Sequence, residues 1–137
     1  MVERTFMMIK PDGVSRDKIG EIIQRIEHKG YAIKAMKMVQ PTPELLAKHY
    51  AEHAGKSFYP SLVQYMTSGP VIAMIGEGTN IVSGWRTIMG TTNPTLAAPG
   101  TIRGDLGREW EGEAVMNIVH GSDSVEAAEY EIKLWFA

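Results

Sequence analysis

The chain has 137 residues, the usual size of one domain and enough to bury an apolar core without metals or disulfides. Cysteine is absent, which excludes disulfides, thiolate zinc sites and a cysteine nucleophile. The formal net charge is −2 and charges of both signs are interspersed, so no basic block indicates an obligatory nucleic-acid partner. The apolar stretch 6–9 is too short for a membrane span. We therefore expect residues 1–137 to form a single domain of a cytoplasmic protein.

The first third of the chain alternates strand and helix patterns. Thr5 to Lys10 is predicted as a buried strand that ends at a turn formed by Pro11-Asp12-Gly13. Isoleucines at positions 19, 22, 23 and 26 have helical spacing, and Lys29-Gly30 is typical of a helix end. Tyr31 to Val39 then has the pattern of a second strand.

The middle of the chain is predicted to be mainly helical. Thr42 has the features of an N-cap, and its helix is expected to continue to about His53. A short helix follows at 61–67, an apolar strand at 71–76 and another helix at 80–89. The long segment 90–112 contains prolines and glycines, and a loop of this length in a compact domain is usually functional.

The last elements complete the pattern of the fold. Residues 115–120 are predicted as a strand that ends in a turn at Gly121. Asp123 and Glu126 have the spacing of a capping box for a final helix through Lys133. The order of elements is typical of an α+β, ferredoxin-like βαββαβ sandwich, with helices packed on one face of a mainly antiparallel sheet.

Three short motifs suggest other functions. Gly55-Lys56-Ser57 lacks the earlier glycine of a phosphate-binding loop, and Gly76-Glu77-Gly78 lacks the third glycine of a dinucleotide fingerprint. The segment from His49 to His53 matches the H-x-x-E-H pattern of inverted zinc peptidases. No third ligand is evident, so we interpret it as a surface helix with two solvated histidines and expect no protein-bound metal.

The segment from Asn117 to Ser124 places His120 at the end of a strand, before a glycine turn and a capped helix. A helix N-terminus attracts phosphate and disfavours the imidazolium form, which keeps the ring nucleophilic. Glu131 in the following helix could hold the ring by a hydrogen bond. The residues alone leave open a buried histidine that is satisfied by a main-chain carbonyl.

The segment 117–124 resembles the active-site signature of nucleoside diphosphate kinases. Similar matches occur at 5–14, at 68–71, at 92–94 and at 99–105, in the order of that family, and they cover nearly the whole chain. The resemblance implies transfer of a terminal phosphoryl group from a nucleoside triphosphate to a nucleoside diphosphate. In the family, the histidine that matches His120 carries the phosphoryl group in a ping-pong mechanism.

The resemblance also implies roles for other positions. Residues that match Lys10, Arg86, Thr92 and Arg103 bind phosphates, and the residue that matches Asn117 binds the region of the sugar and phosphate. Tyr50 and Ser122 match residues that pack around the histidine, and Glu131 matches its orienting acid. Phe58 matches the aromatic ring on which the base stacks, whereas Leu62 matches an apolar neighbour for which a role in the helix core is about as good an interpretation. Family members take Mg²⁺ with the nucleotide phosphates and form homo-oligomers.

Two features depart from the family pattern. The segment from Gly107 to Gly112 looks like an insertion with a hairpin tip near the base, which puts base contacts from Ala114 or Val115 in doubt, and Met116 stands where many members have arginine. Trp110 is expected to cover either the base or, preferably, a neighbouring subunit. Because many relatives continue beyond the position of Ala137, the subunit number is not implied. A non-catalytic nucleotide-binding protein with the same fold is the alternative, and the presence of His120, Lys10 and Arg103 favours the enzyme.

Overall fold

The computed structural model describes residues 1–112 and 115–137, and four of their segments form one antiparallel sheet. Strand β1 (Val2–Ile9) pairs with β3 (Val71–Thr79) on one side and with the short β4 (Val119–Gly121) on the other. Strand β2 (Ala32–Val39) pairs with the outer side of β3 and forms an edge. The order β2-β3-β1-β4 with antiparallel pairing confirms the predicted ferredoxin-like α+β sheet.

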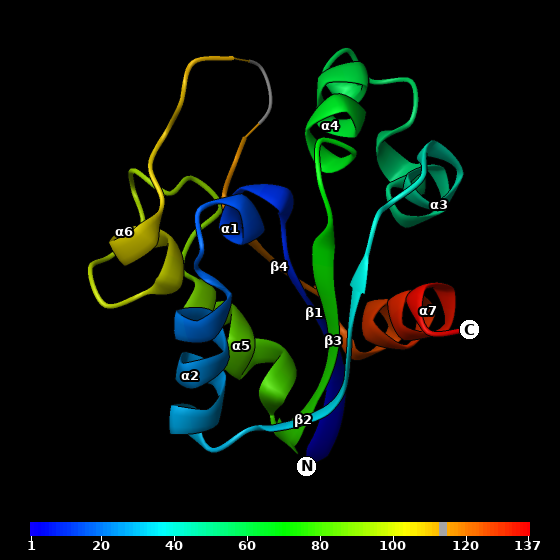
Figure 1. Cartoon of the computed structure of the whole chain (residues 1–137). Helices are drawn as coiled ribbons and strands as arrows, with labels where there is room; N and C mark the ends of the chain where they lie inside the picture. Colours follow the sequence, from blue (N-terminus) through cyan, green and yellow to red (C-terminus); the bar gives the residue numbers. More distant parts are fainter. Residues whose placement is uncertain (113–114) are drawn as a thin grey trace.

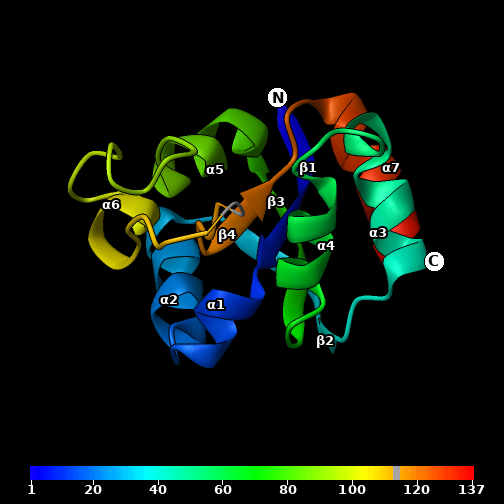
Figure 2. The same cartoon turned by 90° about the horizontal axis from the view of Figure 1, so that it is seen from above.

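Helices cover both faces of this sheet (Figures 1 and 2). On one side lie α2 (Ile19–Lys29) and α5 (Ile81–Met89), and on the other lie α3 (Pro43–His49) and α7 (Val125–Trp135). The remaining helical segments are α1 (Pro11–Ser15), the 3₁₀ turn η1 (Ala51–His53), α4 (Tyr59–Met66) and α6 (Ile102–Leu106). The expectation that helices cover only one face is therefore wrong.

The alternation of side chains along β1 explains the two covered faces. Met7 and Ile9 point into a cluster with Ile22 and Trp85, whereas Phe6 and Met8 belong to a second cluster that includes Trp135. All four of these β1 side chains are fully buried. A strand that is apolar on both faces is typical of a sheet with a layer on each side, so the continuous apolar run at 6–9 already contained this information.

Several helix ends lie where the capping residues in the sequence predicted them. Gly30 ends α2 in the left-handed conformation, with φ of 96°, and the Thr42 hydroxyl accepts a hydrogen bond from the Leu45 N–H at the start of α3. The final helix is different, because the hydroxyl that caps it belongs to Ser124, which accepts from the Ala127 N–H. Asp123 is therefore not the N-cap, and its carboxylate is available for another contact.

Other elements differ from the sequence-based boundaries. The expected turn at Pro11-Asp12-Gly13 is the first part of α1, and the long loop contains α6, which Thr101 caps through the Gly104 N–H. The helix predicted to run to His53 stops at His49 and continues as the 3₁₀ turn η1. The last strand covers only Val119–Gly121 instead of 115–120. Within the described residues, no helix is long and apolar enough to cross a membrane.

Candidate active site

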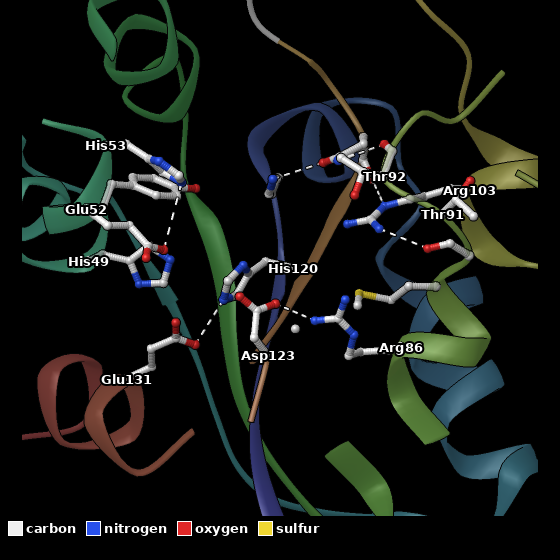
Figure 3. A pocket seen from close by; sticks show the side chains of 16 residues that line it. His49, Glu52, His53, Arg86, Thr91, Thr92, Arg103, His120, Asp123 and Glu131 are labelled. Atoms are coloured by element: carbon white, nitrogen blue, oxygen red, sulfur yellow. Dashed lines mark hydrogen bonds and ion pairs between the residues drawn. The ribbon is translucent and has the colours of Figure 1, made fainter. Parts of the chain in front are cut away.

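A pocket of about 440 Å³ lies beside β4 and is open to solvent (Figure 3). It brings together segments that are far apart in the sequence, including the end of β1, α3 with η1, α5, α6 and α7. Of the residues predicted from sequence, those that line it are Lys10, Tyr50, Arg86, Thr92, Arg103, Asn117, His120 and Glu131. The positive side chains of Lys10, Arg86 and Arg103 around His120 make this pocket suited to a phosphorylated ligand.

His120 lies in β4, and its ring and main chain are held from two directions. Its Nε2 is 3.0 Å from the Glu131 Oε1, and the Trp85 indole N–H donates to its carbonyl oxygen at 3.1 Å. The Glu131 Oε1 also accepts a hydrogen bond of 2.7 Å from the Ser122 hydroxyl, which itself accepts from the Phe6 N–H. These contacts fix the imidazole plane relative to the pocket.

The same contacts assign the tautomer of His120. An ionised carboxylate can only accept hydrogen bonds, so the Nε2 that faces Glu131 must carry a proton. The neutral ring then has its lone pair on Nδ1, and among the described residues no side chain or main-chain group hydrogen-bonds to that nitrogen. His120 is therefore arranged as a nucleophile through Nδ1, with Glu131 as the group that orients it.

Lys10, Asn117 and Arg103 form a buried group beside the histidine. The Lys10 Nζ donates to the Asn117 Oδ1 at 2.9 Å, and the Asn117 amide donates to the Thr92 carbonyl at 3.0 Å. Burial lowers the pKa of Lys10 to about 8, with a smaller contribution from the nearby positive charge of Arg103. The buried ammonium group of this lysine is therefore strongly stabilised when an anion approaches it.

Arg103 is held by the main chain on three sides. Its Nε donates to the Asn117 carbonyl at 3.1 Å, its Nη1 to the Gly90 carbonyl at 3.0 Å and its Nη2 to the Val119 carbonyl at 2.7 Å. Burial lowers the pKa of Arg103 to about 10. The guanidinium therefore has a fixed position and needs little rearrangement to stabilise charge in the pocket.

Arg86 and Asp123 form an ion pair at the more exposed side of the pocket (Figure 3). Arg86 comes from α5, and Asp123 precedes α7. The side chains are 49% and 78% exposed, so this pair is far less constrained than Arg103. A phosphate could exchange with the Asp123 carboxylate on Arg86 at small cost, because exposed ion pairs contribute little.

The predicted residues outside the pocket lining have different surroundings. Ser122 is buried and acts on the histidine through Glu131. Phe58 precedes α4 and is 38% exposed, with its ring 5.4 Å from that of His53. Leu62 packs against the core cluster around Phe6 and Trp135, which favours its role in the helix core. Tyr50, in contrast to these three residues, lines the pocket, and burial raises the pKa of its hydroxyl.

His49 is the residue that the sequence interpretation placed wrongly. It is only 8% exposed, and its ring centroid is 4.7 Å from that of His120. Burial, with added repulsion from His120, Lys10 and His53, holds the pKa of His49 well below its ordinary value. The expectation of a solvated residue fails because α3 packs this side against α7, a tertiary contact that a short motif does not reveal.

The arrangement of His49 also bears on the zinc motif. Side-chain donor atoms of His49, His120 and Glu131 lie within 4.8 Å of one another, which is close enough for a metal. However, the Trp135 indole N–H donates to the Nδ1 of His49 at 3.0 Å, so the neutral ring carries its proton on Nε2 and has no free lone pair. Because α3 ends at His49, the two histidines also do not share a continuous helical face.

Other pocket residues were not predicted from the sequence to belong to the site. Glu52, Met89, Gly90, Thr91 and Gly121 complete the lining together with His53 and Asp123. The segment around Trp110 lies elsewhere: the indole packs under the guanidinium of Arg108 at 3.7 Å and near that of Arg16 at 5.7 Å. The described part of this segment, 107–112, follows α6 and contains no assigned strand. Val115 is exposed away from the pocket, and Ala114 lies outside the described residues.

The family model for nucleoside diphosphate kinase matches residues 3–137 of the chain. The chain belongs to the nucleoside diphosphate kinase family. A nucleoside diphosphate kinase of Moorella thermoacetica is 54% identical over 135 residues, which cover 98% of this chain and 94% of that protein. One of Saccharomyces cerevisiae is 52% identical over 134 residues, covering 98% of this chain and 85% of that protein.

Solved structures agree with this assignment. A nucleoside diphosphate kinase from Halobacterium salinarum, solved in complex with CDP, has a TM-score of 0.93 and 46% identity, covering 99% of this chain and 88% of that chain. The apo enzyme from Encephalitozoon cuniculi has a TM-score of 0.91 and 49% identity, covering 97% of this chain and 88% of that chain. The protein is thus an enzyme that transfers a phosphoryl group from a nucleoside triphosphate to a nucleoside diphosphate through a phosphohistidine.

Proposed function

We propose that His120 is the residue that carries the phosphoryl group and that residues 1–137 act as one catalytic domain. The observation that supports this most strongly is the contact between Nε2 and Glu131, which leaves the Nδ1 lone pair available. In the first step, Nδ1 attacks the terminal phosphorus, the bond to the bridging oxygen breaks and the nucleoside diphosphate leaves. The Nε2 proton stays between the ring and Glu131, where the carboxylate stabilises the positive charge of the phosphorylated ring.

In the second step, a terminal phosphate oxygen of a nucleoside diphosphate attacks the same phosphorus. The bond to Nδ1 breaks, and neutral His120 is restored. Lys10, Arg103 and Arg86 would bind the phosphates with Thr92, while Asn117 would hold the region of sugar and phosphate. Catalysis by this set is positioning and charge stabilisation around the transferred group, which is the usual demand of phosphoryl transfer.

The base would lie on Phe58, outside the buried part of the pocket. The ring is partly exposed, and stacking on an aromatic face is open to every base. Leu62 and Tyr50 would support this region and the histidine, respectively, by packing. This arrangement favours exchange among several nucleosides over selection of one base.

The possible metal-ligating side chains around the pocket are consistent with Mg²⁺ that enters the site bound to the nucleotide. Glu131 is engaged with His120 and Ser122, and Asp123 is paired with Arg86, so the described pocket residues offer no cluster of free carboxylates. Mg²⁺ would neutralise charge on the phosphates, which is where this ion usually binds in such sites. We therefore propose Mg²⁺–nucleotide as the substrate rather than a metal held by the protein.

The surface supports the proposal of a homo-oligomer. Strand β2 is at the edge of the sheet, and its Met36 and Met38 side chains are 53% and 60% exposed. An unpaired strand with apolar side chains is a natural site for a second copy. A cytoplasmic location remains part of the proposal, in keeping with nucleotides as substrates.

The His120→Ala variant tests the proposed carrier. Incubation with γ-labelled ATP and Mg²⁺ should give no acid-labile phosphoenzyme, and transfer to GDP should be lost. His28→Ala is the matched control, because His28 lies in the last turn of α2 and does not line the pocket. Labelling of the His120→Ala protein at the rate of the unmodified enzyme would disprove the assignment.

A further inference from the structure

The main chain just before His120 has an unusual conformation. Ile118 has φ of 73°, in the left-handed region that a β-branched residue rarely adopts. The Val119 N–H donates to the Asn117 carbonyl at 2.7 Å, so a hydrogen bond closes over a single residue. These are the features of a γ-turn with positive φ, which is rare and strained. Such a conformation persists only where its surroundings determine it.

The turn lies between two residues of the active site. Asn117 is on one side of Ile118 and binds Lys10, and His120 follows two residues later. If Ile118 relaxed to negative φ, the direction of the chain would change, and the Asn117 side chain would move relative to the imidazole. The geometry of the phosphate-binding group therefore depends on the conformation of Ile118.

A carboxylate outside the pocket lining holds this turn. The Oδ2 of Asp12, in α1, accepts a hydrogen bond of 3.1 Å from the Ile118 N–H, and the Lys10 N–H donates to the Ile118 carbonyl at 2.6 Å. Asp12 is buried, with 8% exposure. Both main-chain groups of Ile118 are thus bound by the segment that begins α1.

Tyr65 completes the arrangement from a different helix. Its hydroxyl, on α4, donates a short hydrogen bond to the Oδ1 of Asp12. Each carboxylate oxygen therefore has one partner, and the orientation of the carboxyl plane is fixed. Burial, reinforced by the charge of Asp12, raises the pKa of Tyr65 far above its ordinary value, so the hydroxyl keeps its proton as a donor.

Close packing leaves the turn little room to move. A Cβ atom added at Gly13 would lie 3.0 Å from the Cγ2 of Ile118 and 3.3 Å from its carbonyl oxygen. Arg103 also donates to the carbonyls of Asn117 and Val119, the residues before and after Ile118 in the sequence. Glycine at position 13 thus allows α1 to lie close against this turn, where the Asp12 carboxylate accepts from the Ile118 N–H.

We propose that Asp12 and Tyr65 are positioning residues for phosphoryl transfer, and that their hydrogen-bonded pair maintains the strained turn at Ile118 that aligns Asn117 with His120. Neither residue lines the pocket, so both act through the main chain. The pair also connects α4, which follows the proposed base platform at Phe58, with the strand that carries the nucleophile. This inference rests on the proposed role of His120.

The Tyr65→Phe variant is the first test, because it keeps the ring and removes only the hydrogen bond. The rate of His120 phosphorylation by Mg²⁺–ATP should be measured in a single turnover. It should be expressed per enzyme molecule that can be labelled. Since misplacement of reacting groups by about 1 Å can reduce rates by about 10²-fold, we expect a decrease of roughly ten- to a hundredfold. Tyr59→Phe, on the same helix, removes a buried hydroxyl that has no hydrogen-bond partner among the described residues, and it should change the rate less than about twofold.

A merely structural role gives a different result. In that case, Tyr65→Phe would lower the thermal stability, while each folded molecule would be phosphorylated at the normal rate. A normal rate per site overturns the proposal whether or not stability changes. If the unmodified protein is not phosphorylated at His120, the proposed function itself fails, and the two failures are therefore distinguishable.

A double-mutant cycle tests the mechanism of positioning. Glycine adopts positive φ without a steric penalty, so in an Ile118→Gly background the Tyr65→Phe change should slow phosphorylation by a smaller factor. Where Ile118→Gly does not fold, Asp12→Asn serves as the background, because it already disrupts the same pair. An equal factor for Tyr65→Phe with and without the background substitution would show that the hydroxyl does not act through Asp12 and the turn.

Discussion

The phosphate end of the pocket and the proposed base end at Phe58, which lies outside the pocket lining, differ in how firmly their side chains are held. At the proposed phosphate end, Lys10, Arg103 and Asn117 are buried and hydrogen-bonded to one another or to main-chain carbonyls. At the proposed base end, Phe58 is 38% exposed, and its recorded ring contacts are His53 and Lys56. Charges that are fixed before the substrate arrives stabilise developing charge efficiently, whereas a partly exposed ring offers binding without selection.

The largest effect is expected at the phosphate end. Lys10→Met should reduce kcat/KM by about 10²- to 10³-fold, the usual consequence of removing one fixed charge-stabilising donor. Lys34→Met is the matched control, because Lys34 forms an exposed ion pair with Glu77 on the opposite edge of the sheet. Steady-state exchange between ATP and GDP measures both variants. Equal activities of the two variants would contradict a fixed phosphate end.

The lowered pKa of Lys10, about 8, gives this comparison a pH signature. Activity should fall as the pH rises through about 8, because Lys10 loses its charge, and this decline should be absent in Lys10→Met.

Stability should change in the opposite direction. Between about 8 and the ordinary value of 10.5, the unfolded state binds more protons than the folded state, so the unfolding free energy rises with pH relative to that of Lys10→Met. Denaturant titrations across this range would detect the sign.

A smaller effect is expected at the group that orients the histidine. Glu131→Gln retains an acceptor for the Nε2 proton but removes the charge that stabilises the phosphorylated ring, so phosphorylation should slow by roughly tenfold to a hundredfold. Glu129→Gln is the control on the same helix: Glu129 forms an exposed ion pair with Arg4 of β1, and its replacement should leave the rate unchanged. Rapid-quench labelling with ATP compares them. A Glu131→Gln enzyme with the normal rate would remove Glu131 from the mechanism.

The smallest effect is expected at the base end. Phe58→Ala should weaken the binding of all nucleotides by about 1 kcal/mol, the lower part of the range for base stacking, because the ring is partly exposed. Binding of ADP, GDP, CDP and UDP can be compared by calorimetry with that of Phe136→Ala, whose ring lies near Lys37 and not in the pocket. A loss confined to one base would show that this end selects bases.

The features that the sequence could predict are those that depend on local patterns. The antiparallel sheet, the end of α2 at Gly30 and the Thr42 cap depend on local patterns, and the structure agrees with them. The proposed roles of His120 and Lys10 came from motifs in the order of a known family. Signals of this kind are contained in short stretches of chain.

Features that depend on tertiary packing were not predicted. The burial of His49 arises where α3 meets α7, and the hydrogen bond from Trp135 spans 86 positions. The positive φ at Ile118 contradicts the preference of a β-branched residue, so no local rule could indicate it. The predicted cap was also wrong, because the Asp123 carboxylate binds Arg86, 37 positions away in the sequence, and the Ser124 hydroxyl caps the helix.

The most direct test of the central claim is to locate the phosphorus atom on the phosphorylated protein. The enzyme can be labelled with ¹⁵N in its histidines, phosphorylated with Mg²⁺–ATP and examined by NMR under alkaline conditions that preserve phosphohistidine. We predict phosphorus bound to the Nδ1 of His120, because Glu131 engages Nε2 at 3.0 Å. Phosphorus on the Nε2 of His120, or on His49, would contradict the mechanism.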